Sequence, residues 1–266
     1  MRVAAYQYQP GPDIAANGRA IVRAVESAAG QGARFLMTQE CALCGYPPEE
    51  VASVAALDFE AMGAAVEAVR AAARRCGIHV GLGTIRREKE KHHNSILLIG
   101  PDGAMQPPYD KRAVWGYDLN HFQPGANPGV YTVEGWRIGI RICFEVRCPE
   151  YFRELFKAGV DLACVSFCDV SASASPRRLE VIQAHLITRA VENAMFVLAV
   201  NSASKHQTAP TGVFDPDGNV AAAAPRDVEH LLVYDFERPR KSYGRDGRIS
   251  ISRALTGGAG GGEDRP

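Results

Sequence analysis

The stretch WRIGIRICFEVRCPEYFRELFKAGVDLACVSF, residues 136 to 167, contains the pattern that decides the fold. An apolar run ends at Cys143, and a helical pattern with Pro149 in its first turn follows it. A second apolar run, residues 160–167, has the composition of a buried strand. Because strand-like and helix-like segments alternate in the same way along most of the chain, the sequence predicts an α/β architecture.

The other expected elements follow from the same periodicities. Strands are expected at residues 2–9, 34–38, 78–85, 94–100, 129–133, 195–201 and 230–236, and helices at 14–28, 49–75 and 175–194. The long helix 49–75 has a possible break near Ala56, and residues 129–143 suggest a hairpin. One domain is expected over residues 1–255, followed by a disordered glycine-rich tail at 256–266.

Length and charge narrow the class of protein. The 266 residues are 46% hydrophobic, which is enough for a substantial core, and 30 basic residues balance 30 acidic ones. This balance argues against binding to nucleic acid or to an anionic membrane, so the expected partner is a small molecule. The first residues lack a signal-peptide pattern and no window has the length and apolarity of a membrane span, which predicts a cytoplasmic protein.

Seven cysteines at irregular spacings are more typical of reduced cytosolic thiols than of a disulfide framework. Cys41 and Cys44 lack the second ligand pair that a zinc site needs. Cys164 and Cys168 lie in an apolar run and have the pattern of small core residues. The sequence therefore predicts no metal site.

Three polar residues stand at strand ends or in a loop between strands. Glu40 follows the strand 34–38, Cys143 ends the hairpin strand, and Lys111 lies in the loop PYDKRAVWGYD, residues 108–118. Loops after strand ends are where α/β proteins keep their chemistry. A thiol becomes a strong nucleophile when a neighbouring base or cation favours the thiolate, and a carboxylate with an ammonium supplies both. Each residue taken alone also fits a structural or surface role.

These residues and their surroundings resemble the three catalytic blocks of the nitrilase, or carbon-nitrogen hydrolase, superfamily. The blocks are TQECALCGYPPEE (38–50), YDKRAVWG (109–116) and GIRICFEVRCPEYFRELFKAGVDL (139–162). Further segments resemble the family at HFQPG (121–125), TRAVENAMFVLAVN (188–201) and GVFDPDGNV (212–220). The resemblance covers residue 1 to about residue 255. It implies a four-layer α-β-β-α sandwich, commonly assembled as a homodimer or larger homo-oligomer, and no cofactor.

The resemblance also implies a mechanism. Cys143 attacks the carbon of an amide, carbamoyl or nitrile group, and water releases the acid from the resulting thioester or thioimidate. Glu40 is the general base, and Lys111 faces the oxyanion together with the backbone N–H of Phe144. Burial is expected to raise the pKa of Glu40 and Lys111 to lower it, a balance that the sequence leaves open.

Asp118 departs from the family pattern, because many members carry a second active-site glutamate at this position. In one interpretation the shorter side chain of Asp118 still reaches the site and orients Lys111 or the attacking water. In the other it caps a local turn, and the sequence leaves both interpretations open. Glu145 and Arg147 resemble the family's acidic and arginine positions. We expect them to form an ion pair that holds the turn after the nucleophile.

Candidate substrate contacts are Phe144, beside the nucleophile, and four further residues. Phe167 and Asp169 follow a strand next to the one that carries Cys143 and are expected to line the pocket. Tyr46 and Trp115 are aromatic candidates for flanking the amide. Each of these four residues fits a packing or loop role equally well.

The function predicted from these residues is hydrolysis of a carbon-nitrogen bond in a small amide or N-carbamoyl compound. The alternatives are an acyltransferase that uses the same thioester, and a nitrilase. A non-catalytic interaction protein is disfavoured because Glu40, Lys111 and Cys143 are all present. The segment CDVSASASPRR, residues 168–178, differs from the corresponding segment of several family branches, so their specificity is not carried over.

Overall fold

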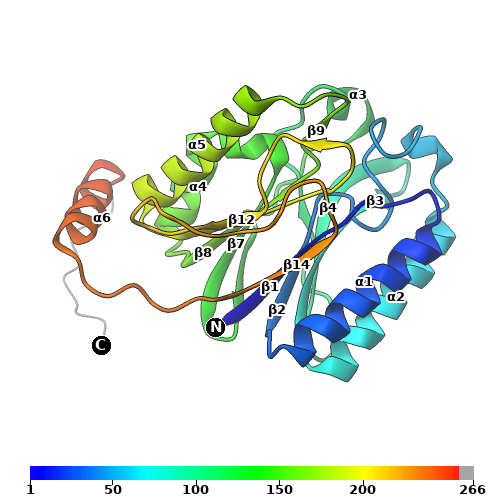
Figure 1. The fold of residues 1–266 in the computed structure, drawn as a ribbon, viewed down its shortest axis with the longest axis horizontal. Helices are drawn as coiled ribbons and strands as arrows, with labels where there is room; N and C mark the ends of the chain where they lie inside the picture. Colours follow the sequence, from blue (N-terminus) through cyan, green and yellow to red (C-terminus); the bar gives the residue numbers. More distant parts are fainter. Residues whose placement is uncertain (258–266) are drawn as a thin grey trace.

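Two six-stranded β-sheets form the centre of the computed structural model, which describes residues 1–257 (Figure 1). The first sheet has the order β14-β1-β2-β3-β4-β5, and its strands are β1 (Arg2–Gln7), β2 (Phe35–Thr38), β3 (His79–Glu88), β4 (Lys91–Ile99), β5 (Tyr109–Asp110) and β14 (His230–Asp235). The second has the order β13-β12-β10-β8-β7-β6, with β6 (Val130–Val133), β7 (Trp136–Ile142), β8 (Leu162–Phe167), β10 (Phe196–Asn201), β12 (Gly212–Phe214) and β13 (Val220–Ala223). A small third sheet pairs β9 (Val170–Ser171) with β11 (His206–Gln207).

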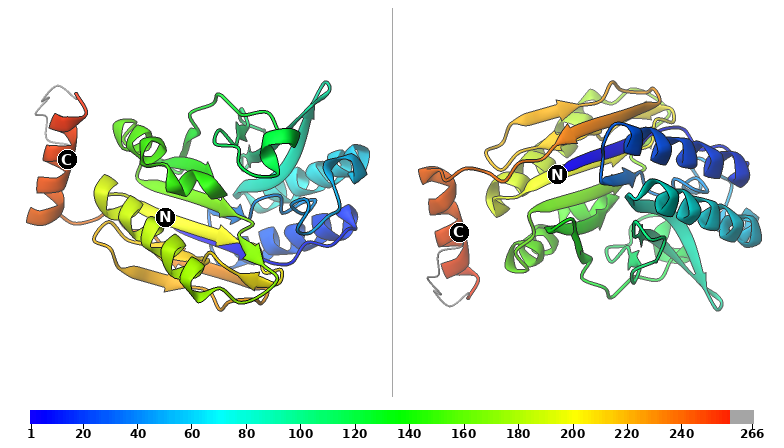
Figure 2. Two further views of the ribbon diagram at one scale, coloured as in Figure 1. Left: turned by 90° about the horizontal axis from the view of Figure 1, so that it is seen from above. Right: turned by 90° about the horizontal axis from the view of Figure 1, so that it is seen from below.

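Helices cover the outer faces of the two sheets, as Figure 2 shows from opposite sides. On one side lie α1 (Ile14–Gly30) and α2 (Phe59–Cys76), and on the other α4 (Pro149–Lys157) and α5 (Pro176–Asn193). Shorter elements are α3 (Asp118–His121) and the 3₁₀-helices η1 (Val54–Ala56) and η2 (Cys143–Arg147). The order of layers is helix, sheet, sheet, helix, so the predicted four-layer α-β-β-α sandwich is confirmed.

Because side chains alternate between the two faces of each strand, the four layers enclose three hydrophobic cores. In β2, Phe35 and Met37 point into the core between the sheets, while Leu36 points toward α1 and α2. In β8, Cys164 joins the core between the sheets, while Val165 points toward α4 and α5. Because successive side chains of a strand point to opposite faces, a strand buried on both faces is apolar throughout, as these strands are.

The ends of β2, β7 and β8 meet where the two sheets face each other. Strands β7 and β8 are parallel with Ile142 opposite Ser166, and Ser166 Oγ donates a hydrogen bond to the carbonyl of Thr38 at 2.8 Å. The backbone N–H of Glu40 donates to the carbonyl of Phe167. The residues that follow β2 in one sheet and β7 in the other are therefore held close together.

The expected helix over residues 49–75 is wrong in its first part. The chain makes turns after Gln39, forms η1, and begins α2 only at Phe59. The side chain of Asp58 accepts hydrogen bonds from the backbone N–H groups of Glu60 and Ala61, both at 3.0 Å, and so caps α2 at its first turn. A well-capped start outweighs the apolar periodicity of the residues before it.

One helix of the C-terminal part was not expected from the sequence. Helix α6 (Tyr243–Leu255) stands at the edge of the molecule, at the end of an extended segment (Figure 1). Ion pairs from Arg245 and Arg248 to Asp217, at 2.9 and 3.1 Å, attach it to the turn that precedes β13. The expected tail at 256–266 falls, from residue 258 on, outside the described residues.

Two glycines provide a test of how tightly the sheet packs behind Glu40. A Cβ on Gly83, in β3, would lie 1.9 Å from the carbonyl oxygen of Gln39, whereas a Cβ on the exposed Gly63 of α2 meets no atom within 4 Å. Gly83→Ala is expected to lower the free energy of unfolding by roughly 3 kcal/mol through overpacking. Gly63→Ala is expected to raise it by about 0.5–1 kcal/mol because alanine favours the helix. Urea unfolding measures both changes, and equal stabilities for the two variants would contradict the packing argument.

Candidate active site

Glu40 lies just beyond β2 and is 1% exposed. Its carboxylate accepts three hydrogen bonds, from Asn94 Nδ2 at 2.6 Å, from Lys111 Nζ at 2.9 Å and from the backbone N–H of Cys168 at 2.8 Å. Burial raises the pKa of Glu40, the charge of Lys111 lowers it, and the nearby Asp118 raises it again, with a net upward shift. The sequence left open whether these opposing effects raise or lower the pKa of Glu40, and in the structure their net effect is to raise it.

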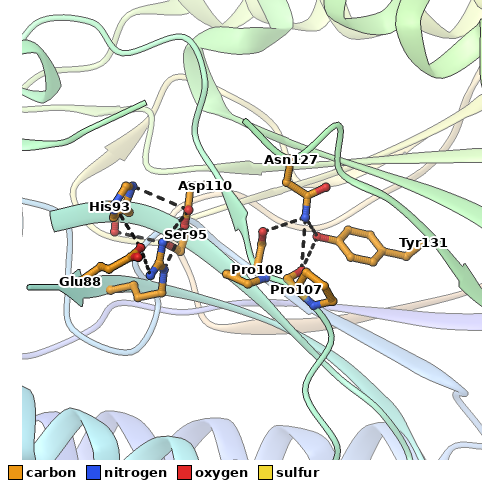
Figure 3. A network of polar contacts seen from close by, with 9 residues as sticks. Glu88, His93, Ser95, Pro107, Pro108, Asp110, Asn127 and Tyr131 are labelled. Carbon is orange, nitrogen blue, oxygen red and sulfur yellow. Dashed lines mark hydrogen bonds and ion pairs between the residues drawn. The ribbon is translucent and has the colours of Figure 1, made fainter. Parts of the chain in front are cut away.

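Lys111 follows the two-residue strand β5, and Figure 3 shows the contacts of Asp110 in that strand with Ser95 and His93 of β4. Asp110 accepts a hydrogen bond from Ser95 Oγ at 2.6 Å and forms an ion pair with Arg86 at 2.7 Å. The backbone N–H of Lys111 donates to the carbonyl of Asn94 at 2.8 Å and so continues the pairing with β4. A strand this short gains its fixed position from these side-chain contacts.

The segment that leads into β5 is held by a second set of contacts, also drawn in Figure 3. Asn127 Nδ2 donates to the carbonyl of Pro108 at 2.9 Å, and the Tyr131 hydroxyl donates to the carbonyl of Pro107 at 2.8 Å. Prolines cannot pair through a backbone N–H, so carbonyl contacts of this kind are what fixes such a segment. Both ends of β5 are thereby tied down, and Lys111 starts from a defined place.

The ammonium of Lys111 lies between two carboxylates. Its Nζ is 2.9 Å from Glu40 Oε1 and 2.7 Å from Asp118 Oδ2, and the residue is 3% exposed. Burial opposes the charge, but Glu40, Cys143 and Asp118 together raise the pKa of Lys111 well above its ordinary value. The lysine therefore remains a cation at neutral pH.

Asp118 opens α3 and is fully buried. One carboxylate oxygen accepts a hydrogen bond from the Tyr46 hydroxyl at 2.7 Å, and the other contacts Lys111. Of the two interpretations that the sequence left open, this geometry agrees with orientation of Lys111, because both oxygens are engaged there and not in a turn cap. The shorter side chain still reaches the lysine.

Cys143 lies at the sharp turn between β7 and η2, half-buried and facing a cavity. Its φ angle of 46° is in the left-handed region that non-glycine residues seldom occupy, a form of strain that concentrates at functional sites. Burial and the charge of Glu40 raise the pKa of the Cys143 thiol, while Lys111 lowers it, with a net upward shift. The resting sulfur is a thiol and needs a base to become a nucleophile.

Glu145 holds this turn, but not through the expected ion pair with Arg147, which is wrong. Its fully buried carboxylate accepts hydrogen bonds from the backbone N–H of Ile142 at 2.7 Å, the Tyr109 hydroxyl at 2.7 Å and the backbone N–H of Arg112 at 2.6 Å. A buried carboxylate needs nearby hydrogen-bond donors, and here two backbone N–H groups and one hydroxyl supply them. Glu145 thus joins the turn at Cys143 to the loop after Lys111.

Arg147 lies instead over the ring of Phe144, with its Cζ 5.5 Å from the ring centroid. Phe144 in turn stacks on Trp115, with ring centroids 5.1 Å apart and planes inclined by 7°. Trp115 is 61% exposed. The guanidinium and the two rings form one wall of the cavity in front of Cys143.

The cavity has a volume of about 670 Å³ and brings together most of the expected site residues. Glu40, Lys111 and Cys143 line it, as do four of the five candidate substrate contacts, Tyr46, Trp115, Phe144 and Asp169. Its other lining residues were not proposed as substrate contacts: Pro48, Glu49, Gly116, Tyr117, Arg147, Cys168, Val170 and Arg178.

Phe167 does not line the cavity, contrary to expectation. Its side chain is fully buried in the core between the second sheet and the outer helices, together with Ala163 and Val165 of the same strand. Period-two alternation along β8 sends these three side chains away from the first sheet. Only the carbonyl of Phe167 contributes to the site, as the acceptor for the N–H of Glu40.

Asn94 was missed by sequence reasoning. It sits in β4, is fully buried, and donates to Glu40. The one available signal was a polar residue at the start of an expected apolar strand. Within residues 1–257 no group of three or more histidine, cysteine or acidic side chains is placed to hold a metal ion. None of the helices in the same range has the length and apolar character to cross a membrane.

Comparisons with known proteins agree with this geometry. A family model described as carbon-nitrogen hydrolase matches residues 2–241. A hydrolase of Mycobacterium tuberculosis is 28% identical, with 96% of each chain covered, and an (R)-stereoselective amidase of Pseudomonas sp. is 26% identical, with 73% of each covered. The solved structure of an amidase from Nesterenkonia sp. AN1 is 26% identical, with a TM-score of 0.79 over 96% of this chain and 99% of that one.

The charge of Glu40 provides a test of the electrostatics around the thiol. Because burial and this carboxylate raise the pKa of Cys143, Glu40→Gln is expected to shift the alkylation of Cys143 by iodoacetamide to lower pH. Lys111→Met is expected to shift it to higher pH, because the ammonium lowers that pKa. The measurement is the pH dependence of the alkylation rate, followed by mass spectrometry of the Cys143 peptide. A profile that both variants leave unmoved would refute the arrangement.

Glu145 provides a test of the turn. Glu145→Gln presents an amide N–H₂ to donors that need an acceptor, and we expect the free energy of unfolding to fall by about 1–3 kcal/mol or more. The control is Glu150→Gln, an exposed position in the first turn of α4, where we expect no change. Urea unfolding of both variants measures the difference, and equal stability would mean that Glu145 does not hold the turn.

Proposed function

The chain belongs to the carbon-nitrogen hydrolase family, and we propose that it hydrolyses a small amide through a thioester on Cys143. It is an enzyme that acts on carbon-nitrogen bonds other than peptide bonds. The observation that carries the finer proposal is the contact of 2.9 Å between Lys111 Nζ and Glu40 Oε1 in a cavity that Cys143 also lines. A base, a cation and a thiol in one cavity are what acyl transfer to sulfur requires.

The first half of the proposed reaction forms the thioester. Glu40 takes the proton of the Cys143 thiol, and the sulfur attacks the amide carbon. The raised pKa of Glu40 suits this role, because a carboxylate with a pKa nearer to neutral accepts the thiol proton more readily. The carbon-nitrogen bond then breaks, and the proton held by Glu40 passes to the departing nitrogen, so that ammonia leaves.

The second half releases the acid. Glu40 takes a proton from water, the hydroxide attacks the thioester carbon, and the carbon-sulfur bond breaks. The proton returns to the sulfur, and both residues regain their starting states. In each half the carbonyl oxygen carries negative charge, which the Lys111 ammonium and the backbone N–H of Phe144 stabilise.

Lys111 acts in this scheme as a fixed charge and transfers no proton. The raised pKa keeps it protonated, and its contacts with Glu40 and Asp118 hold its position before substrate arrives. A donor that is already in place does not have to reorganise as charge develops, and one such donor contributes about 3–4 kcal/mol to lowering the barrier. Asp118 is in this proposal a positioning residue for the cation.

The relatives include amidases at 26% identity and nitrilases at 24% and 25%, and the solved amidase structures favour an amide as the proposed substrate. The matched structures include a double mutant of the Nesterenkonia amidase in complex with acrylamide, at 25% identity and a TM-score of 0.79. An omega-amidase of Danio rerio is 26% identical over 79% of this chain. We propose hydrolysis as the outcome and acyl transfer as the alternative, which added hydroxylamine distinguishes by the formation of a hydroxamate.

Ammonia release from a panel of aliphatic amides, dicarboxylic acid monoamides, N-carbamoyl amino acids and nitriles tests the proposal. We expect turnover of at least one amide, an acyl adduct on Cys143 in the intact mass, and loss of both in Cys143→Ala. The matched control is Cys164→Ala, a buried thiol in β8 that faces the core between the sheets and is expected to retain activity. Full activity in Cys143→Ala would exclude the proposed nucleophile.

A further inference from the structure

The cavity walls carry two arginines that the proposed reaction does not use. Arg147 and Arg178 both line the cavity that contains Cys143. We propose that their guanidinium groups bind a carboxylate at the end of the substrate away from the reacting amide. The substrate is then an anionic amide, such as the monoamide of a short dicarboxylic acid. This inference rests on the proposed amidase function and adds the substrate class.

Arg178 is held in a geometry that leaves part of its guanidinium available. It belongs to the first turn of α5 and is exposed. Its Nε lies 2.9 Å from Asp169 Oδ1 and its Nη2 lies 3.1 Å from Asp169 Oδ2, a bidentate contact along one edge. Within residues 1–257 its Nη1 makes no hydrogen bond with the protein. A guanidinium fixed along one edge presents its remaining N–H groups without further loss of side-chain freedom.

Asp169, which fixes Arg178, is itself firmly placed. It is 4% exposed and accepts hydrogen bonds from Thr208 Oγ1, while its backbone N–H donates to Asn201 Oδ1 at 2.9 Å. A buried carboxylate with several donors forms a rigid support for the charge in front of it. Arg178, whose side chain is 50% exposed, is therefore anchored to the cavity wall by a buried carboxylate.

Arg147 supplies the second charge and has no internal counterion. It lies four residues after the nucleophile, over the ring of Phe144, which stacks on Trp115. In the described part of the chain no carboxylate lies within ion-pair distance of its guanidinium. The aromatic rings hold its position but leave its charge uncompensated.

The other charges on the walls are already matched. Lys111 is shared by Glu40 and Asp118, and the exposed Glu49 forms an ion pair with Lys205 Nζ at 3.0 Å. With Asp169 paired to Arg178, Arg147 is the charged side chain of the lining that lacks an opposite charge in residues 1–257. A carboxylate on the substrate would complete the set, and a planar guanidinium is the side chain best shaped to receive it.

A pair of nearly isosteric amides separates charge from shape. Succinamate carries a carboxylate, and 4-oxopentanamide carries a neutral methyl ketone in the same place. We expect the wild-type enzyme to favour succinamate in kcat/KM. The ratio of the two kcat/KM values is expected to fall by about 10- to 100-fold in Arg178→Gln, the loss typical of a hydrogen bond to a charged group. Arg178→Lys, which keeps the charge but not the bidentate shape, is expected to lie between.

The neighbouring Arg177 provides a matched control. Its side chain is 85% exposed, pairs with Glu180, and does not line the cavity, so Arg177→Gln is expected to leave the ratio unchanged. If Arg178→Gln does not fold, Arg147→Gln measures the other guanidinium by the same ratio. Wild-type kcat/KM values that are equal for the two amides would overturn the inference while leaving the proposed function intact.

Binding to Cys143→Ala, measured by calorimetry, tests the inference without turnover. We expect succinamate to bind more tightly than 4-oxopentanamide, and the addition of Arg178→Gln to remove the difference. This pattern would support the carboxylate site even if neither amide were hydrolysed, so that binding and turnover test the inference and the proposed function separately. Equal affinities for the two amides in Cys143→Ala would overturn the inference.

Discussion

A single buried ammonium lies at the centre of this structure, between two carboxylates that are almost completely hidden from solvent. Removing three charges from water is costly, and the arrangement persists only because Glu40 and Asp118 both contact Lys111 and further donors reach both carboxylates. The three residues come from the end of β2, the end of β5 and the start of α3. Because none of them tolerates the loss of its partners, the cluster fixes the relative positions of segments that are far apart in the sequence.

The proposed nucleophile, Cys143, is held in place by different contacts. Cys143 sits in a strained backbone conformation at the end of β7, and a conformation of that kind persists only where its surroundings enforce it. Glu145 enforces it by accepting hydrogen bonds from two backbone N–H groups. One belongs to Ile142, just before the turn, and the other to Arg112, just after Lys111. The same carboxylate thereby couples the thiol to the cation.

The sequence predicted those parts of the site that depend on strand ends. Glu40 and Cys143 follow apolar runs, and both line the cavity because parallel strands of the two sheets end at the same place. The direction of each side chain was harder to predict. Phe167 points to the face of its strand opposite the cavity, and Asn94 is a polar residue at the start of a strand that was expected to be apolar. The start of α2 depended on one capping residue, Asp58. Helix α6 was missed because YGRDGRISISRAL has few apolar residues and two glycines, so its periodicity is weak.

Reactivity and selectivity draw on different parts of the chain. Glu40, Lys111 and Cys143 are fixed by strands of the two central sheets, whose packing leaves little freedom for change. One wall of the cavity is built from residues of the segment 168–178, which ends in the first turn of α5. The backbone N–H of Cys168 donates a hydrogen bond to Glu40, so this segment also contacts the buried cluster. Arg178 pairs with Asp169 instead, and its substitution alters the charge of the wall without removing a partner of the cluster. In the proposed amidase, the buried cluster supplies the acyl-transfer chemistry, and the proposed carboxylate site at Arg147 and Arg178 selects the amide.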